Sequence, residues 1–106
     1  MRLFALFMTV LMMTASAAAE TIDVKYWGAV DLRTYKCAET VSSFVHRICY
    51  DESKAHLVVR LRNTYYPYCR VDRAIVSAWL NSSSKGRFYN ANIKSDAVAG
   101  RFDCRR

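Results

Sequence analysis

The residues with the best-defined chemistry are four cysteines, Cys37, Cys49, Cys69 and Cys104. An even number of cysteines in a short chain indicates a disulfide framework, in which each bond contributes about 2–4 kcal/mol of stability. The cysteines are spaced 12, 20 and 35 residues apart, so no C-x-x-C pair is present to hold zinc. We predict two disulfides, no metal site and no cofactor.

Arginines and tyrosines in the middle of the chain could bind an anionic partner. Arginine neutralises phosphates and aromatic rings stack on bases, a combination typical of proteins that bind single-stranded nucleic acid. We predict such a surface on the sheet face away from the helix, where Arg47, Arg60 and Arg62 lie, with Tyr65, Tyr66 and Tyr68 nearby. The partner would be nucleic acid, an acidic protein or an envelope polymer. The alternative is that Tyr66 and Tyr68 belong to the core.

A second candidate anion site is the run Ser84-Lys85-Gly86-Arg87. Backbone N–H groups that follow a glycine, flanked by the cations Lys85 and Arg87, could hold phosphate or carboxylate, with Asn90 nearby. The alternative is structural: Gly86 ends a helix and Asn90 hydrogen-bonds the turn.

The distribution of charge supports an anionic partner. The net charge of the 106-residue chain is +7. Residues 20–56 contain five basic and six acidic residues, whereas residues 57–106 contain ten basic and three acidic ones. This asymmetry favours an anion-facing surface in the second half of the chain.

No catalytic constellation is visible. The two histidines, His46 and His56, fall within predicted strands, and no spacing places a serine beside either. No thiol nucleophile remains if the four cysteines are oxidised. We therefore predict a binding module that is not an enzyme. The alternative is a protein-interaction or inhibitor-type domain that uses Tyr26, Trp27 and Tyr35.

Three strands are expected to position these residues. Enrichment in β-branched and aromatic residues, with alternating polarity in the second run, predicts strands at 44–50, 56–62 and 65–69. Pro67 cannot donate a hydrogen bond to a neighbouring strand, so we place the third strand at a sheet edge.

One main helix follows the strands. Asp72 is a suitable N-cap, and Gly86 is a residue able to end the helix in the left-handed conformation. A further short turn of helix is expected at 87–94. The apolar stripe of the main helix consists of Ile75, Val76, Trp79 and Leu80.

The predicted fold class is α+β: a small three-stranded antiparallel sheet packed against one main helix and stapled by disulfides. Residues 20–41 form an extension without clear periodicity that Cys37 ties to the domain. In a simple meander the middle strand separates Cys49 from Cys69 by about 9.6 Å, which is too far for a disulfide. Two pairings remain open: Cys37–Cys49 with Cys69–Cys104, or Cys37–Cys69 with Cys49–Cys104.

The N-terminal residues have the pattern of a secretory signal peptide. Arg2 precedes an apolar run from Leu3 to Met13, and Ala17 and Ala19 form an A-x-A cleavage site. The run is too short for a transmembrane helix, which needs roughly 20 apolar residues. We predict a signal peptide at 1–19 and an exported protein, periplasmic or secreted, with no membrane span after cleavage. The other segments are an extension at 20–41, a domain at 42–94 and a C-terminal tail at 95–106.

Several short motifs occur between residues 42 and 94. They are Ser42-Ser43, Ile48 with Tyr50-Asp51, the alternating Leu57, Val59 and Leu61, the central Tyr66 and Tyr68, and the run from Ser84 to Asn90 with Ile93-Lys94. With these motifs the segment resembles the KTSC domain, a short module at the end of some lysyl-tRNA synthetases that also occurs alone in bacterial proteins. The resemblance implies the same order of three strands and a helix, and its synthetase context implies RNA binding as a candidate function.

Overall fold

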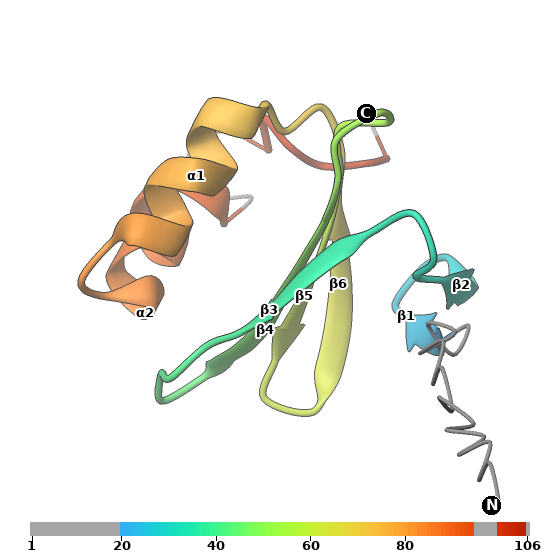
Figure 1. The fold of residues 1–106 in the computed structure, drawn as a ribbon, viewed down its shortest axis with the longest axis horizontal. Helices are drawn as coiled ribbons and strands as arrows, with labels where there is room; N and C mark the ends of the chain where they lie inside the picture. Colours follow the sequence, from blue (N-terminus) through green and yellow to red (C-terminus); the bar gives the residue numbers. More distant parts are fainter. Residues whose placement is uncertain (1–19, 95–99, 106) are drawn as a thin grey trace, which may run out of the picture.

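The computed structural model describes residues 20–94 and 100–105. The predicted signal peptide at 1–19 lies outside the described residues, as do 95–99 and 106 of the predicted tail. Figure 1 shows a sheet with the helices on one of its sides.

The sheet has six strands. They are β1 (Thr21–Val24), β2 (Gly28–Asp31), β3 (Lys36–Glu39), β4 (Val45–Asp51), β5 (His56–Leu61) and β6 (Thr64–Tyr68). Their order is β2-β1-β6-β5-β4-β3. Neighbouring strands are antiparallel except β1 and β6, which are parallel and share the pair Val24 and Tyr65. The sheet is therefore mixed.

The predicted fold of three strands and one main helix is wrong, because the N-terminal extension forms β1, β2 and β3. Of these four-residue strands, Thr21–Val24 alternates polar and apolar residues, a strand signal that our prediction overlooked, whereas Gly28–Asp31 and Lys36–Glu39 show no such alternation. The β1–β2 turn uses the left-handed conformation at Tyr26 (φ 74°) and Gly28 (φ 78°). The three strands predicted in the centre of the chain are confirmed as β4, β5 and β6.

The predicted edge position of Pro67 is also wrong, since β6 lies between β1 and β5. The ladder with β1 consists of the single pair Val24–Tyr65, and the carbonyl of Tyr65 accepts a hydrogen bond from Lys25 N at 2.9 Å. Because the β1 pairing ends before Pro67, a residue without an N–H is tolerated at this position.

The helical segments are α1 (Arg73–Asn81), α2 (Lys85–Phe88) and the π-helix η1 (Tyr89–Ile93). The predicted N-cap is confirmed, because the Asp72 carboxylate accepts a hydrogen bond from Ile75 N at 3.0 Å. The predicted helix end at Gly86 is wrong, since Ser82 caps α1 and Gly86 lies within α2. A Cβ on Gly86 would come within 2.6 Å of Phe44 Cε1, so this glycine allows a close approach rather than a left-handed helix end.

The helices pack on one face of the sheet around Trp79. Its ring is fully buried, and its Nε1 donates to Lys85 O at 3.0 Å. The predicted apolar stripe is wrong at Leu80, which is 40% exposed. The buried face of α1 contains Val76 and Trp79 instead. The other buried members of this first core are Val45, Ile48, Leu57, Val59, Tyr68, Val71, Val76, Tyr89, Ile93 and Phe102.

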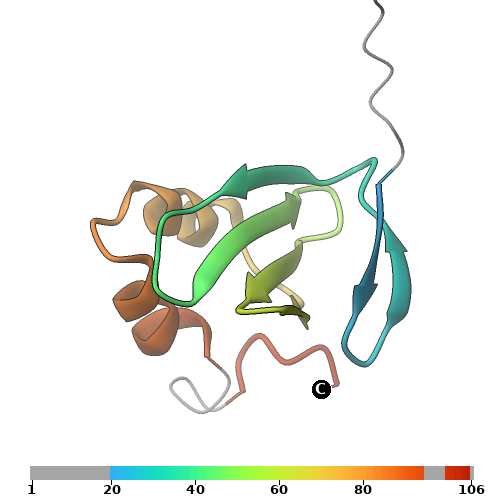
Figure 2. The same cartoon turned by 90° about the horizontal axis from the view of Figure 1, so that it is seen from below.

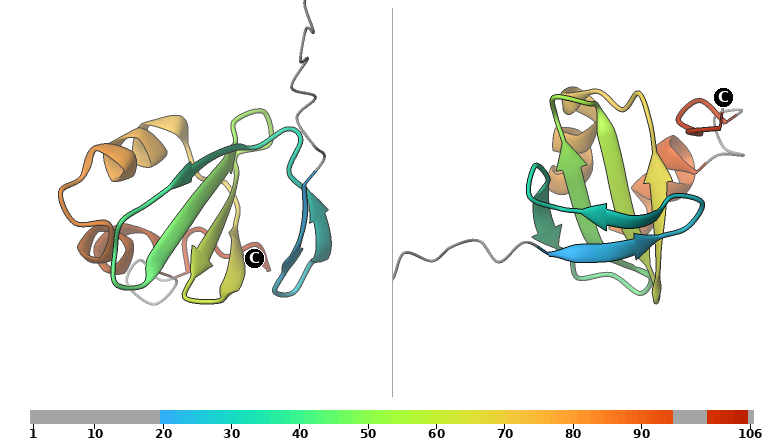
Figure 3. Two further views of the ribbon diagram at one scale, coloured as in Figure 1. Left: turned by 60° about the horizontal axis from the view of Figure 1, so that its bottom comes forward. Right: turned by 90° about the vertical axis from the view of Figure 1, so that its right-hand side faces the viewer.

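The β1–β2 hairpin covers the opposite face. Val24 and Leu32 pack against Cys49 and Val58 in a second, smaller core. Figure 2 shows the helices and the hairpin on opposite sides of the central strands. In the right-hand view of Figure 3, β1 and β2 cross in front of the sheet. The extension is thus part of the fold.

Asp51 is buried at the end of β4, where it fixes the segment between β2 and β3. Its carboxylate accepts hydrogen bonds from Thr34 Oγ1 and Ser53 Oγ, both at 2.7 Å, and from Lys54 N at 3.3 Å. Burial alone would raise the pKa of Asp51, but these hydrogen bonds outweigh burial and lower it. Asp51 is therefore an ionised structural group.

Two disulfides are present, Cys37–Cys49 and Cys69–Cys104. This is one of the two pairings that the sequence left open. Cys37 and Cys49 face each other across β3 and β4, with their Cα atoms 4.0 Å apart. The second bond ties the C-terminal tail to the end of β6, where Cys69 N also donates to Phe102 O at 2.8 Å.

Candidate functional site

The eight residues predicted to bind an anion do not form one site. The register pairs Arg47 with Arg60 on the sheet face away from the helices. Tyr66 and Tyr68 instead pair with residues of the first core, on the face that the helices cover. The three predicted residues around Gly86 lie on α2 and η1.

Arg47 is the centre of an ion-pair network. Its guanidinium donates two hydrogen bonds to Glu20, at 2.6 and 2.8 Å, and one to Tyr65 Oη at 3.2 Å. Its Nε lies 3.0 Å from Glu39 Oε1. The hydrogen bonds to Glu20 and then to Tyr65 raise the pKa of Arg47. Because two carboxylates neutralise this cation, its geometry supports a structural role that holds Glu20 and β3 against β4.

Arg60 and Arg62 lie at the turn between β5 and β6. Arg60 Nε donates to Arg62 O at 3.0 Å, and Arg62 adopts a φ of 55°. Tyr66 lies between this turn and Tyr68 along β6. Anion binding by the two arginines stays a prediction.

Lys85, Arg87 and Asn90 line one polar groove of about 330 Å³. Lys85 Nζ donates to Ser82 O at 2.6 Å, whereas Arg87 and Asn90 are exposed. The groove also includes Ser42 and Ser43, so it brings together two of the sequence motifs. Its other lining residues are Val41, Phe44, Ser83, Ser84 and Gly86. Anion binding here likewise stays a prediction.

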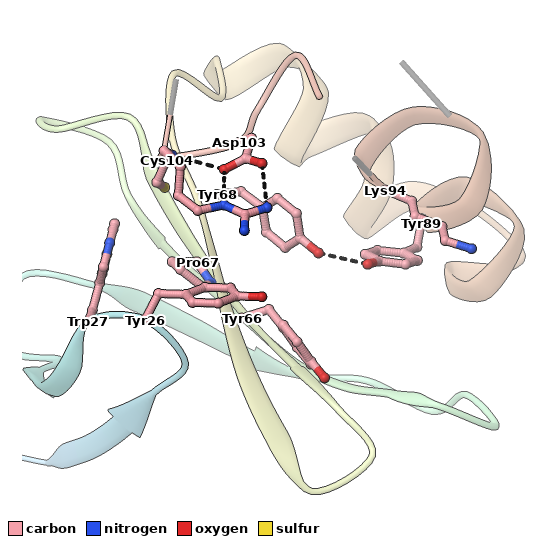
Figure 4. A pocket seen from close by; sticks show the side chains of 10 residues that line it. Tyr26, Trp27, Tyr66, Pro67, Tyr68, Tyr89, Lys94, Asp103 and Cys104 are labelled. Carbon is pink, nitrogen blue, oxygen red and sulfur yellow. Dashed lines mark hydrogen bonds and ion pairs between the residues drawn. The ribbon is translucent and has the colours of Figure 1, made fainter. Parts of the chain in front are cut away.

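Tyr66 and Tyr68 open onto a different cavity, which we call the aromatic pocket. Its volume is about 270 Å³. Figure 4 shows side chains from the β1–β2 turn, β6, η1 and the C-terminal tail converging on it. The lining residues are Tyr26, Trp27, Tyr66, Pro67, Tyr68, Tyr89, Lys94, Asp103, Cys104 and Arg105. Five of these ten residues are aromatic.

Two buried tyrosines lie at one side of the aromatic pocket. The hydroxyls of Tyr68 and Tyr89 share a hydrogen bond of 2.7 Å, drawn in Figure 4. Burial, and then the bond to Tyr89, raises the pKa of Tyr68. Both conditions favour the neutral phenol of Tyr68. Its hydroxyl can therefore hydrogen-bond a ligand, but it cannot act as a general base.

The exposed side of the aromatic pocket combines rings with cations. Tyr26 is 62% exposed. Lys25 Nζ lies 5.5 Å from the ring centroids of both Tyr26 and Tyr66, and Arg105 Cζ lies 4.8 Å from that of Tyr26. These separations are within the range of cation–π contacts. Lys25 therefore brings positive charge to these aromatic faces, whereas the charge of Arg105 is compensated by Asp103.

The C-terminal tail holds Arg105 in place. Arg105 donates to both carboxylate oxygens of Asp103, at 2.8 and 3.0 Å, and these hydrogen bonds lower the pKa of Asp103 to about 2. Arg70 donates to Asp103 O at 2.6 Å, and the Cys69–Cys104 disulfide fixes the same segment to β6. Sequence reasoning missed Asp103 and Arg105. The available signal was their position on either side of Cys104, which is informative only when the pairing with Cys69 is known.

Comparison with protein-family models identifies the family of this chain. The model of the KTSC domain matches residues 41–96, more than half of the chain. The chain belongs to the KTSC domain family. The resemblance found in the sequence motifs is thereby confirmed. The function of the KTSC domain is unknown, and no family of enzymes is indicated.

A solved structure supports the same assignment. The KTSC chain is similar to the crystal structure of a KTSC domain protein from Yersinia pestis, with 28% sequence identity and a TM-score of 0.57. The similarity covers 64% of this chain and 90% of the other. No curated protein matches the chain.

Only some of the residues that line the aromatic pocket fall within the KTSC match. Tyr66, Tyr68, Tyr89 and Lys94 lie inside residues 41–96, on motifs that carried the resemblance. The other walls come from the β1–β2 turn and from the tail, both outside the match. The pocket therefore combines family residues with residues added by this chain.

The structure also bears on other chemistry. Within residues 20–94 and 100–105, no group of three or more His, Cys, Asp or Glu side chains is placed to hold a metal ion. Neither His46 nor His56 hydrogen-bonds a hydroxyl of another described residue. None of the helices in this part of the chain has the length and apolar character needed to cross a membrane.

Proposed function

We propose that this KTSC protein is an exported, non-enzymatic module that binds single-stranded nucleic acid at the aromatic pocket. The observation that supports this most strongly is the convergence of five aromatic residues on one cavity, which also includes Lys94 and the Arg105–Asp103 ion pair and has Lys25 at its edge. Aromatic rings bind bases by stacking, at about 1–3 kcal/mol per base. Neighbouring cations neutralise the phosphates that link them.

The geometry suggests a distinct task for each part of the pocket. The exposed ring of Tyr26 and the partly buried ring of Tyr66 are the stacking surfaces. Lys25 lies close to both rings and would contact the phosphate between two stacked bases. The neutral hydroxyl of Tyr68 would hydrogen-bond a base edge.

The disulfides support the exported part of the proposal. Two bonds, with no free cysteine among the described residues, are compatible with an oxidising compartment outside the cytoplasm. The predicted signal peptide at 1–19 would direct the chain there.

The alternative surface predicted from the extension's aromatics has weaker support. Trp27 and Tyr35 pack against the second core, and the Trp27 ring lies 5.1 Å from that of His56. Only Tyr26 of the three is exposed, and it belongs to the aromatic pocket.

Fluorescence anisotropy with labelled single-stranded RNA and DNA tests the proposal, using the oxidised chain from Glu20 to Arg106 at low and near-physiological salt. We expect Tyr26→Asn, which removes the ring but tolerates the left-handed backbone, to weaken binding about tenfold. Lys25→Gln should make the slope of log K against log salt concentration shallower by about 1, the loss of one phosphate contact. The control is Lys54→Gln, an exposed cation that lies outside the pocket and the other candidate anion sites, which should leave binding unchanged.

Two outcomes would contradict the proposal. One is binding that Tyr26→Asn and Lys25→Gln leave unchanged. The other is competition by heparin as effective as that by unlabelled nucleic acid, because stacking would then contribute nothing. A loss of binding in Arg62→Gln alone would instead favour the turn between β5 and β6 as the anion site.

A further inference from the structure

A second cavity lies between the edge of the sheet and α1, and its apolar lining is mainly aliphatic rather than aromatic. We call it the β3–α1 groove; its volume is about 370 Å³. Its apolar lining comes from Ala38 of β3, Ile48 and Tyr50 of β4, and Val76 and Leu80 of α1. Leu80 is the apolar side chain that α1 leaves 40% exposed. An exposed apolar surface with polar residues at its margin is typical of an interaction site.

The strand beside this groove is an open sheet edge. Among residues 20–94 and 100–105, β3 is the last strand of the sheet and pairs with β4 alone. Thr40 N donates to His46 O at 3.2 Å, just beyond the paired residues of β3. Hydrogen-bonded and non-hydrogen-bonded pairs alternate along an antiparallel ladder. Counting back from Thr40, the pair Ala38–Ile48 is therefore hydrogen-bonded, and the pairs formed by Cys37 and Glu39 are not.

The backbone N–H and C=O groups of Cys37 and Glu39 consequently point away from β4, toward solvent. The Cα separation of 4.0 Å between Cys37 and Cys49 agrees with a narrow, non-hydrogen-bonded pair. Ala38 lies on the same sheet face as its partner Ile48, so its small side chain borders the groove. A strand added along β3 would thus find both backbone partners and an apolar groove for alternate side chains.

The charges around the groove define the partner further. Lys36 is exposed and makes no ion pair with any carboxylate in the described part of the chain. Arg73 is 78% exposed and pairs with the similarly exposed Glu52 at 3.2 Å. The rim of the groove therefore has a net positive charge that complements an acidic segment.

We propose that the β3–α1 groove binds an extended, acidic–apolar segment of a protein partner by adding it to the sheet as a strand beside β3. Main-chain hydrogen bonds to Cys37 and Glu39 would provide affinity. Apolar side chains at every second position would enter the groove against Leu80, and a carboxylate would meet Lys36. This is the strand-addition mode of peptide recognition. It does not depend on the nucleic-acid function, because the two cavities share no residue.

The first test uses a short labelled peptide in which Val and Leu alternate with Glu and Thr. We expect Glu39→Pro to weaken its binding about tenfold, because proline removes a donor that faces solvent and not one that pairs with β4. The matched control is Glu39→Ala, which removes the same carboxylate and keeps the N–H. The same peptide with alternate amides N-methylated should not bind.

A second pair of variants tests the groove itself. Leu80→Glu should weaken the peptide about tenfold, whereas Ala78→Glu, on an exposed part of α1 outside the groove, should not. Ser77→Glu, at a groove position that is also exposed, should likewise weaken the peptide, with Ala78→Glu as the same matched control. Lys36→Glu should weaken the acidic peptide and strengthen a counterpart with Lys in place of Glu.

The proposal is overturned if the peptide does not bind, or if Glu39→Pro and Leu80→Glu leave its binding unchanged. It is also overturned if sedimentation shows a dimer that these two variants dissociate, because a second copy of the chain would then occupy the groove. Circular dichroism melts of each variant show whether a loss of binding reflects unfolding. If Leu80→Glu does not fold, the test rests on Ser77→Glu and on the N-methylated peptide.

Discussion

The KTSC segment at 41–96 and the segments joined to it at 20–40 and 100–105 differ in what stabilises them. The KTSC segment supplies every buried member of the first core except Phe102. The N-terminal segment contributes only Val24 and Leu32 to the buried part of the second core. Each disulfide joins one cysteine of the KTSC segment to one outside it. The family part has a core of its own, whereas the added parts depend on covalent bonds and ion pairs.

Both candidate binding sites lie where the two regions meet: the β1–β2 turn and the tail complete the aromatic pocket, and β3 forms one wall of the β3–α1 groove. Binding at either site should therefore be more sensitive to loss of the added segments than the fold of the KTSC segment is.

The largest expected effect concerns the first core. Trp79→Ala should lower the free energy of unfolding by about 3–5 kcal/mol, because it removes the fully buried ring on which the helices pack. Since small domains have a margin of about 5–15 kcal/mol, hydrogen exchange should accelerate throughout the chain. Leu32→Ala, the comparison in the second core, should accelerate exchange mainly in residues 21–35. Equal effects of the two variants on the whole chain would show that there is one cooperative unit.

The disulfides should have the next largest effects. Replacing Cys69 and Cys104 by Ala should cost about 2–4 kcal/mol in urea unfolding. The same change at Cys37 and Cys49 should cost about 1 kcal/mol less, because that bond closes a span of 12 residues and the other a span of 35. The first change should also weaken binding at the aromatic pocket, and the second at the β3–α1 groove. If each pair of substitutions affected both sites equally, the division into a core and added segments would be wrong.

The smallest effect concerns the tail. Hydrogen bonds from Arg105 hold the pKa of Asp103 at about 2, below the ordinary value of 3.8. A carboxyl with a lowered pKa stabilises the folded state above its unfolded pKa, and this contribution is lost as the pH falls from about 4 through 2. Carboxyl NMR should therefore give a midpoint near 2, and Arg105→Gln should move it back toward 3.8. A normal midpoint in the unsubstituted chain would show that the tail is not held as described.

The parts of the fold that the sequence predicted correctly are those governed by local rules. Strands β4, β5 and β6 follow from enrichment in β-branched and aromatic residues, and the N-cap Asp72 from its own hydrogen bond to Ile75 N. The predicted helix end was wrong because Gly86 is required for a different reason: Phe44, which is distant in sequence, packs too close to leave room for a side chain. In the extension only β1 alternates polar and apolar residues, and that short signal was overlooked; the sequences of β2 and β3 do not alternate.

The candidate site was predicted in part. Tyr66 and Tyr68 were identified as binding residues together with Arg47 and Arg60, but the register places the two pairs on opposite faces of the sheet. Residue types alone could not show this, because a shift of one residue in register reverses the face of every side chain. The glutamates that neutralise Arg47, from residues 20 and 39, could not be foreseen either.

The sequence by itself determined the family, the central strands, the start of the main helix and the presence of two disulfides, since motifs, local periodicity and cysteine number are properties of the chain. Only the tertiary structure decided the disulfide pairing, the six-stranded order and the two cavities. These depend on which distant segments of the chain come together: Arg105 lies over the Tyr26 ring, and Ala38 and Leu80 line one groove. Packing and register, rather than residue type, determine which of those segments meet.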